Sequence, residues 1–240
     1  MPRATICLPT YDERENLGPM VATLLELLGP DDRVLVIDDG SPDGTGELAD
    51  ELAAAHDRVA VLHRTAKAGL GPAYVAGFRR ALADGADLVL EMDCDFSHDP
   101  ADVPRLIAAA ADADVVVGSR YAAGGRIENW GAGRRFVSRA GSLYAQILLA
   151  APLRDLTGGF KCYRRAVLER IDLDAVRSRG YAFQIETTYR ALRAGFRVVE
   201  IPIVFTDREA GTSKMSRSIV LEAIWRVPYL GLLALGGRLR

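Results

Sequence analysis

The sequence has few cysteines, and those it has lie far apart. Among 240 residues, only Cys7, Cys94 and Cys162 carry thiols. An odd number of separated cysteines, without the short spacings of zinc ligands, argues against both a disulfide scaffold and a cysteine metal site. We therefore expect reduced cysteines and a cytosolic setting.

Long apolar runs and an excess of one charge are also missing. No stretch reaches the roughly 18 to 20 uninterrupted apolar residues that span a bilayer. The best candidate, residues 219–235, is interrupted by Glu222, Arg226 and Pro228, which favours a segment that lies on a membrane. The N-terminus shows no secretory signal. A net charge of −2 gives no basic surface for nucleic acid, so we expect no such partner.

What the sequence does contain is a regular alternation of short β-branched runs with amphipathic segments. The predicted strands are 5–8, 33–37, 59–62, 88–92 and 115–117, and the predicted helices are 15–28, 45–55, 71–83 and 101–110. This alternation predicts an α/β fold with a mostly parallel sheet and helices on both faces. After Ala122 we expect a Gly- and Arg-rich loop, helices near 138–150 and 183–194, and a strand over 198–204.

Polar residues follow four of the predicted strands. They are Pro9 to Glu13, Asp38 to Gly44, Asp93 to Asp95, and Gly118 to Tyr121. In an open parallel sheet, ligands bind beyond the carboxyl ends of the strands, where the strand order reverses. The sequence therefore predicts a ligand site at this edge of the sheet.

The two carboxylates of Asp93-Cys94-Asp95 follow an apolar strand. In an extended chain they would share one face at roughly 6 to 7 Å. Mg²⁺ characteristically takes one or two carboxylates and leaves its other positions to substrate phosphates and water. This favours a metal site, although the tripeptide also occurs by chance in loops. His98 could be a third ligand, but a turn that leads into a helix is the favoured reading.

Asp38 and Asp39 allow two interpretations. Adjacent carboxylates at a strand end could recognise the base and ribose of a nucleotide. The glycines and polar residues that follow could equally form an Asx-turn and a helix cap around Asp43 to Thr45. Both remain open for Asp38 and Asp39, while we expect Asp43 to be structural.

Taken in order, the motifs resemble those of the inverting GT-A glycosyltransferases of family 2, and within them the dolichol-phosphate or polyprenol-phosphate mannose synthases. The matching stretches cover nearly the whole chain: Pro9 to Leu17, Asp38 to Thr45, Lys67 to Gly71, Asp93 to His98, Gly118 to Tyr121, Arg134 to Arg139, Asp155 to Phe160, Phe183 to Glu186, and Phe205 to Arg208 with Ser213-Lys214. Cys94 replaces a common alanine, and Arg135 replaces a frequent lysine.

The resemblance implies a role for each matching position. Donor binding would involve Pro9, Tyr11, Glu13, Asp38, Asp39, Lys67, Gly71, Asp93, Arg208 and Lys214. Asp93, Asp95 and Gln184 would coordinate Mg²⁺ or Mn²⁺, and Arg120, Arg134 and Ser138 would bind the acceptor phosphate. The catalytic residues would be Asp95, Arg120 and Arg134.

The implied reaction is transfer of mannose from GDP-mannose to a polyprenyl phosphate, with inversion. We expect a catalytic GT-A domain over residues 1–210, and over 211–240 a polar loop followed by an amphipathic helix that associates with the membrane. Trp225 and Tyr229 would anchor this segment, and Arg226, Arg238 and Arg240 would contact anionic headgroups. The protein would act at the cytoplasmic face of the membrane, where an integral membrane protein could be its partner.

Two alternatives remain. A related enzyme could move glucose or another sugar from a UDP-sugar to polyprenyl phosphate. A catalytically silent subunit could bind a nucleotide-sugar and recruit a membrane partner, but the intact acidic pair and the arginines argue against it. An aspartate-based phosphatase is disfavoured because its Asp-x-Asp would follow the first strand, which here ends in Pro9-Thr10-Tyr11.

Overall fold

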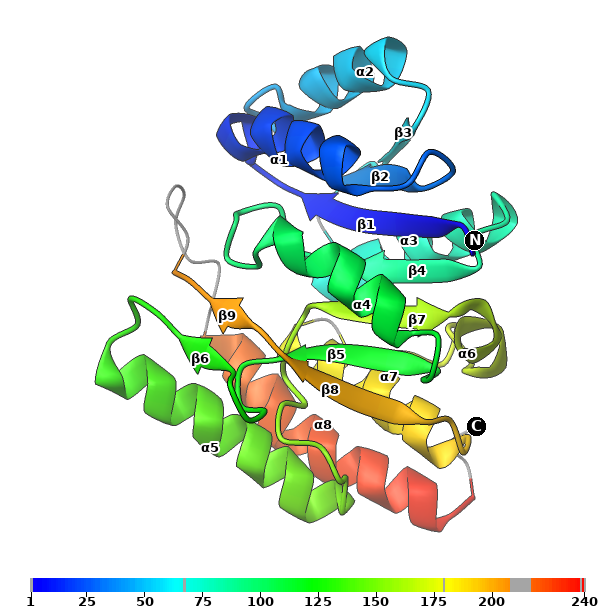
Figure 1. Cartoon of the computed structure of the whole chain (residues 1–240). Coiled ribbons are helices and arrows are strands. Elements are labelled where there is room, and N and C mark those ends of the chain that lie inside the picture. The colour runs from blue at the N-terminus through cyan, green and yellow to red at the C-terminus, as the bar shows by residue number, and fades with distance from the viewer. Residues whose placement is uncertain (1, 67, 179, 208–216, 238, 240) are drawn as a thin grey trace.

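A seven-stranded sheet in the order β3-β2-β1-β4-β7-β5-β8 forms the centre of the computed structural model (Figure 1). The structure describes residues 2–66, 68–178, 180–207, 217–237 and 239. The strands are β1 (Ala4–Thr10), β2 (Arg33–Asp38), β3 (Val59–His63), β4 (Leu88–Glu91), β5 (Val115–Ser119), β7 (Lys161–Arg164) and β8 (Val198–Pro202). All neighbours pair in parallel except β7, which is antiparallel to β4 and β5. The predicted α/β fold with a mostly parallel sheet is confirmed.

Helices cover both faces of this sheet, because its central strands are apolar on both sides. On β1, Ile6 and Leu8 pack into one hydrophobic core and Cys7 packs into the other. The first core lies under α1 (Arg14–Leu27), α2 (Thr45–Ala55) and α4 (Val103–Ala109), which follows a short 3-10 helix, η1 (Pro100–Asp102). The second lies under α3 (Leu70–Ala83), α6 (Arg165–Arg170) and α7 (Tyr181–Arg193) (Figure 1).

The second half of the chain differs from the sequence prediction. The last six residues of the predicted Gly- and Arg-rich loop, 132–137, are the start of α5 (Ala132–Leu149), which begins six residues earlier than expected. Arginine is a good helix former, and the glycines at 131 and 133 obscured this. The predicted strand 198–204 is broken into β8 and β9 (Val204–Phe205), and β9 pairs with β6 (Arg126–Ile127) in a separate small sheet.

The C-terminal helix α8 (Arg217–Leu235) lies against α5 and α7 (Figure 1). Val227 and Leu230 of α8 share a third hydrophobic core with Ala145 and Leu149 of α5 and Tyr189 of α7. One side of the expected membrane-associating segment is therefore part of the protein core. Among the described residues, no helix is both long enough and apolar enough to cross a membrane.

The three cysteines are unpaired, as the sequence predicts, and all three are buried. Burial raises the pKa of the Cys7 and Cys162 thiols well above the ordinary value, so both stay protonated. Cys94 points into the first hydrophobic core. Cys94, between the two aspartates, thus packs in the core and does not take part in the acidic site.

Candidate active site

The loops that follow β1 and β2 are joined at the carboxyl edge of the sheet. The backbone N–H of Glu13 donates to Oγ1 of Thr45 (3.0 Å), and the N–H of Asp12 donates to Oγ of Ser41 (3.1 Å). Strand order reverses between β1 and β4, because β2 and β3 lie on one side of β1 and β4 lies on the other. The joined loops therefore form one wall of the crevice where open α/β sheets bind ligands.

Asp38 holds this wall together. Its Oδ2 accepts hydrogen bonds from the backbone N–H groups of Gly40 and Ser41 (both 3.1 Å), and its Oδ1 accepts from Thr10 Oγ1 (3.3 Å). This is the Asx-turn that the sequence left open for Asp38. Asp43 is structural, as expected: hydrogen bonds from Thr45 and Arg14 outweigh the effect of burial and lower its pKa.

Asp39 faces a different partner. Its Oδ1 accepts from Nη1 of Arg64 at 2.6 Å. Burial, together with the negative charge of Asp38, raises the pKa of Asp39, and the guanidinium of Arg64 opposes that shift. The two adjacent carboxylates thus have different partners, and the partner of Asp39 is Arg64, which the sequence analysis did not identify.

The remaining predicted donor residues are placed unevenly. Pro9, Tyr11 and Glu13 are half-buried at the end of β1. Gly71 is buried, and a Cβ there would overlap the carbonyl oxygen of Ser178, so close packing of α3 explains the glycine without a ligand. Lys67, Arg208 and Lys214 lie outside the described residues.

The acidic motif lies in a loop and not at the end of an extended strand. β4 ends at Glu91, and Phe96 has a positive φ of 57°. The backbone after Glu91 is therefore not extended as far as Asp95, and the distance between the two carboxylates stays a prediction. Asp95 is buried and its Oδ1 accepts from the N–H of Ser97 (3.1 Å), whereas Asp93 is half-buried.

His98 lies inside the protein beneath this loop. Its Nδ1 accepts from the backbone N–H of Asp93 (3.4 Å), and its ring packs on Phe160 and Phe205 at centroid distances of 5.0 and 5.2 Å. Burial lowers the pKa of His98 to about 4, a shift that the carboxylate of Asp95 opposes. His98 is thus a neutral side chain that supports the acidic loop, in line with the favoured structural reading.

Gln184, for which the resemblance implies a metal-ligand role, has a buried lysine beside its amide oxygen. Its Oε1 accepts from Nζ of Lys161 at 2.6 Å, and this hydrogen bond uses one of the two lone pairs of the amide oxygen. Lys161 is fully buried, and its Nζ also lies 3.2 Å from Oε1 of Glu91. Burial lowers the pKa of Lys161 and raises that of Glu91, and their attraction opposes both shifts. Gln184 belongs to this buried network.

Arg120 lies on the other side of β7 and forms a buried ion pair. Its Nε and Nη2 each donate to a different oxygen of Asp155 at 2.7 Å, and Nη2 also donates to Thr157 (2.8 Å). Burial alone would raise the pKa of Asp155, but the charge and hydrogen bonds of the Arg120 guanidinium have the larger effect, so the net result is a lowered pKa. Asp155 therefore stays ionised and fixes the plane of Arg120.

The other two predicted acceptor residues, Arg134 and Ser138, are on the first turns of α5. The guanidinium carbon of Arg134 lies 4.1 Å from the ring centroid of Trp130, and its Nη1 donates to Asp207 (2.7 Å). The hydroxyl of Tyr121, next to Arg120, donates to Ser138 (2.8 Å). The structure thus brings the three predicted acceptor residues to one place, next to the uncapped N-terminus of α5.

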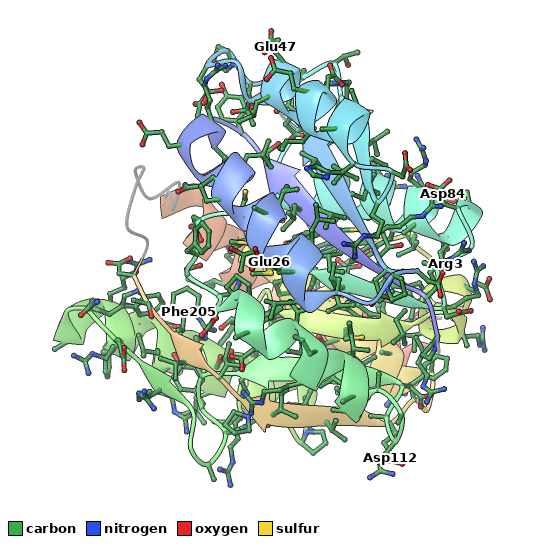
Figure 2. The ribbon with its side chains drawn as sticks, turned by 45° about the horizontal axis from the view of Figure 1, so that its top comes forward. Arg3, Glu26, Glu47, Asp84, Asp112 and Phe205 are labelled. Carbon is green, nitrogen blue, oxygen red and sulfur yellow. The ribbon has the colours of Figure 1, made fainter. Side chains whose placement is uncertain are left out.

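Trp130 and Phe205 connect the acceptor residues to the acidic loop. The ring centroid of Phe205 lies 5.2 Å from the ring centroids of both His98 and Trp130. It lies 5.6 Å from the guanidinium carbon of Arg120. Phe205 lies at the end of the molecule where α5 begins (Figure 2). Sequence reasoning gave no role to Trp130, Asp155 or Phe205. The available signals were a lone tryptophan in a Gly-rich loop and the matching stretches that begin at Asp155 and Phe205.

The described residues contain no group of three or more His, Cys, Asp or Glu side chains that could hold a metal ion. Asp93 and Asp95 do fit a magnesium or manganese ion that is completed by substrate phosphates, because such an ion needs only one or two carboxylates from the protein. The predicted third ligand, Gln184, shares its amide oxygen with Lys161, and its metal-ligand role stays a prediction.

Arg226 was expected to face anionic headgroups, and this prediction is wrong. Its Nη2 pairs with Glu186 of α7 at 3.1 Å, and its Nε donates to Ser178 (3.1 Å). Glu186 is fully buried and also pairs with Arg190. A buried carboxylate requires such partners, so Arg226 ties α8 to α7.

Comparison with known proteins agrees with this geometry. Residues 5–172 match the family described as glycosyl transferase family 2. The chain is 51% identical over 232 residues to the polyprenol monophosphomannose synthase of Mycolicibacterium smegmatis, covering 96% of this chain and 87% of the relative. It is 50% identical over 232 residues to the undecaprenyl-phosphate mannosyltransferase of Micrococcus luteus, covering 97% and 95%.

Solved structures share the fold at low identity. Glucosyl-3-phosphoglycerate synthase from Mycobacterium tuberculosis, in complex with Mn²⁺, UDP-glucose and phosphoglyceric acid, matches with a TM-score of 0.68 and 17% identity, over 94% of this chain and 80% of that one. A mannosyltransferase from Pyrobaculum calidifontis, in complex with GDP-mannose and Mn²⁺, matches with a TM-score of 0.61 and 20% identity, over 98% and 74%. These likenesses support the GT-A type of α/β fold.

Proposed function

Because this chain belongs to glycosyl transferase family 2, we propose that it transfers mannose from GDP-mannose to a polyprenyl phosphate. The two relatives that are 51% and 50% identical to this chain are enzymes named for mannose transfer to polyprenol or undecaprenyl phosphate. The observation that carries the proposal is the meeting of Arg120, Arg134 and Ser138 around Tyr121 and Trp130, beside the acidic loop after β4. Cations next to an acidic loop suit the attack of one phosphate on a sugar diphosphate.

Asp93 and Asp95 would hold Mg²⁺ or Mn²⁺ against the donor diphosphate. When bound, the metal supplies positive charge that offsets the charge developing on the leaving GDP. His98 and Ser97 hold the loop that carries both aspartates, through the Asp93 N–H and the Asp95 carboxylate. The protein contributes a fixed loop with two carboxylates.

The acceptor needs positioning more than activation. A phosphate monoester is an anionic nucleophile near neutral pH, so the reaction requires no dedicated general base. Arg120 and Arg134 orient its oxygen toward the anomeric carbon, since a guanidinium presents a planar fork to phosphate. We expect one in-line displacement that converts an α-linked donor into a β-linked product.

The lipid end of the acceptor would meet an apolar face formed by α5 and α8. Its members are exposed: Phe136, Val137, Leu143, Ile147 and Leu148 from α5, and Ile224, Trp225, Tyr229, Leu232 and Leu235 from α8. We define these ten residues as the apolar face. Contiguous exposed apolar patches mark interaction surfaces, and a membrane surface suits a lipid substrate. The protein would act at the cytoplasmic face of the membrane, with or without an integral membrane partner.

The variant Arg134→Ala tests the site. Transfer to a short polyprenyl phosphate should fall by at least about tenfold, because a charge-assisted hydrogen bond to the acceptor is lost. Binding of GDP-mannose, measured by calorimetry, should change by less than about twofold. Equal losses of donor binding and transfer would show that Arg134 has no specific role toward the acceptor.

The second candidate function, transfer of glucose or another sugar from a UDP-sugar, differs only at the donor. The loops after β1 and β2 would read the base, and their described contacts are internal hydrogen bonds that suit either nucleotide. Competition between GDP and UDP for the donor site separates the two. Preferential binding of UDP would favour transfer of glucose or another sugar from a UDP-sugar over transfer of mannose.

A further inference from the structure

The two acceptor arginines are each paired with a carboxylate, but the two pairs differ in exposure. The side chains of Arg120 and Asp155 are 6% and 0% exposed, and their pair is bidentate. The side chains of Arg134 and Asp207 are 28% and 35% exposed, and one bond of 2.7 Å joins them. The first pair is a fixed part of the core, whereas a competing anion can replace the carboxylate in the second.

Trp130 gives Arg134 a contact that does not involve its anionic partner. The guanidinium lies over the indole ring at 4.1 Å from the centroid, in the geometry of a cation–π contact. Trp130 itself is buried against Phe205. Arg134 therefore keeps one contact when its anionic partner is exchanged.

The indole N–H of Trp130 provides an independent indication of a ligand. Nε1 is buried and has no hydrogen-bond acceptor within the part of the chain that the structure describes. Buried donors of this kind normally have an acceptor. An oxygen-rich anion at Arg134 would supply one.

We infer that the carboxylate of Asp207 occupies the place of the acceptor phosphate on Arg134, and that the phosphate displaces it and also accepts the indole N–H of Trp130. Asp207 then acts as a specificity-determining residue. A phosphate monoester, with a charge of about −1.5 to −2, competes with a single carboxylate, while an uncharged polyprenol does not. This inference relies on the proposed function only for the chemistry of the acceptor.

The structure also provides a direct reporter. The chain has two tryptophans, Trp130 and the 78% exposed Trp225. In a Trp225→Phe background, the fluorescence of Trp130 reports on the acceptor site alone. The probe is farnesyl phosphate in detergent without donor, farnesol is the control ligand, and calorimetry on the same samples gives an independent dissociation constant.

Removal of the competing carboxylate should tighten binding. Asp207→Asn is expected to lower the Kd for farnesyl phosphate about two- to fivefold, because a partly exposed ion pair contributes free energy of this size. Arg134→Ala is expected to raise the Kd at least about tenfold. The matched control is Glu128→Gln, which removes a half-exposed carboxylate paired with Arg126 and should change the Kd by less than about 1.5-fold.

The opposite results are equally clear. An unchanged or raised Kd for Asp207→Asn would mean that Asp207 positions Arg134 for the phosphate, and a decrease equal to that of Glu128→Gln would be a general charge effect. Either result overturns the inference, as does the absence of farnesyl phosphate binding by both methods. If binding follows the prediction but no mannose is transferred, the proposed function fails and the inference stands.

Discussion

At the scale of single residues, the buried pair of Arg120 and Asp155 should dominate stability at the acceptor site. Asp155→Asn leaves a buried guanidinium without its counter-charge, which costs about 3–5 kcal/mol of unfolding free energy. Urea unfolding at neutral pH measures this. Glu128→Gln, which breaks an exposed pair, should cost less than about 1 kcal/mol. Similar losses for both variants would contradict a buried ionic role for Asp155.

Which residues take part could be predicted from their types and order, but what each one contacts could not. The sequence predicts that Asp38, Asp93 and Arg120 gather at one sheet edge. It does not show that Asp38 closes a turn, because an Asx-turn and a ribose contact use the same carboxylate. It does not show that Lys161 donates to Gln184, since that contact joins strand β7 to helix α7.

At the scale of elements, Arg226 links α8 to α7 through its ion pair with Glu186. Arg226→Ala should leave Glu186 with fewer charged partners and loosen α8, so that amide hydrogen exchange within residues 224–235 becomes faster. Arg193→Ala, at the exposed end of α7, is the control and should leave exchange in α8 unchanged. An equal response of α8 to both variants would rule out a specific link.

Elements with strong periodicity could be predicted, and short charged ones could not. The helix at 45–55 has the predicted bounds, because its amphipathic pattern is clear. Strand β7 was missed because it has only four residues and begins with a charged side chain, Lys161, that is satisfied by Glu91 inside the sheet. Its antiparallel pairing brings the loop of Asp155 close to Arg120.

At the scale of the whole molecule, the apolar face gathers nearly all the large exposed apolar side chains of the described chain. A double variant, Trp225→Ser with Leu232→Ser, should weaken sedimentation with anionic phospholipid vesicles by about tenfold or more, because it removes two large apolar groups from the contact. The control is Leu27→Ser, which alters a 38% exposed leucine on α1, away from this face. Equal binding of the double variant and the control would exclude a membrane role for the apolar face.

The overall architecture could be predicted from the alternation of strands and helices, but the position of the last helix could not. An apolar segment such as residues 219–235 fits a membrane surface and a protein core equally well by composition. The structure assigns Val227 and Leu230 to the core and leaves Trp225 and Leu232 exposed. This division depends on contacts with α5 and α7, which are distant in sequence.

Transfer of radiolabelled mannose from GDP-mannose to a short polyprenyl phosphate in detergent tests the central claim most directly. It is measured with Mg²⁺, with EDTA and with Asp95→Asn. We predict a lipid-linked mannose product that requires the metal and falls by at least about a hundredfold in the variant. Formation of the product at an undiminished rate in EDTA and with Asp95→Asn, or no product from GDP-mannose while UDP-glucose supports transfer, would contradict the account.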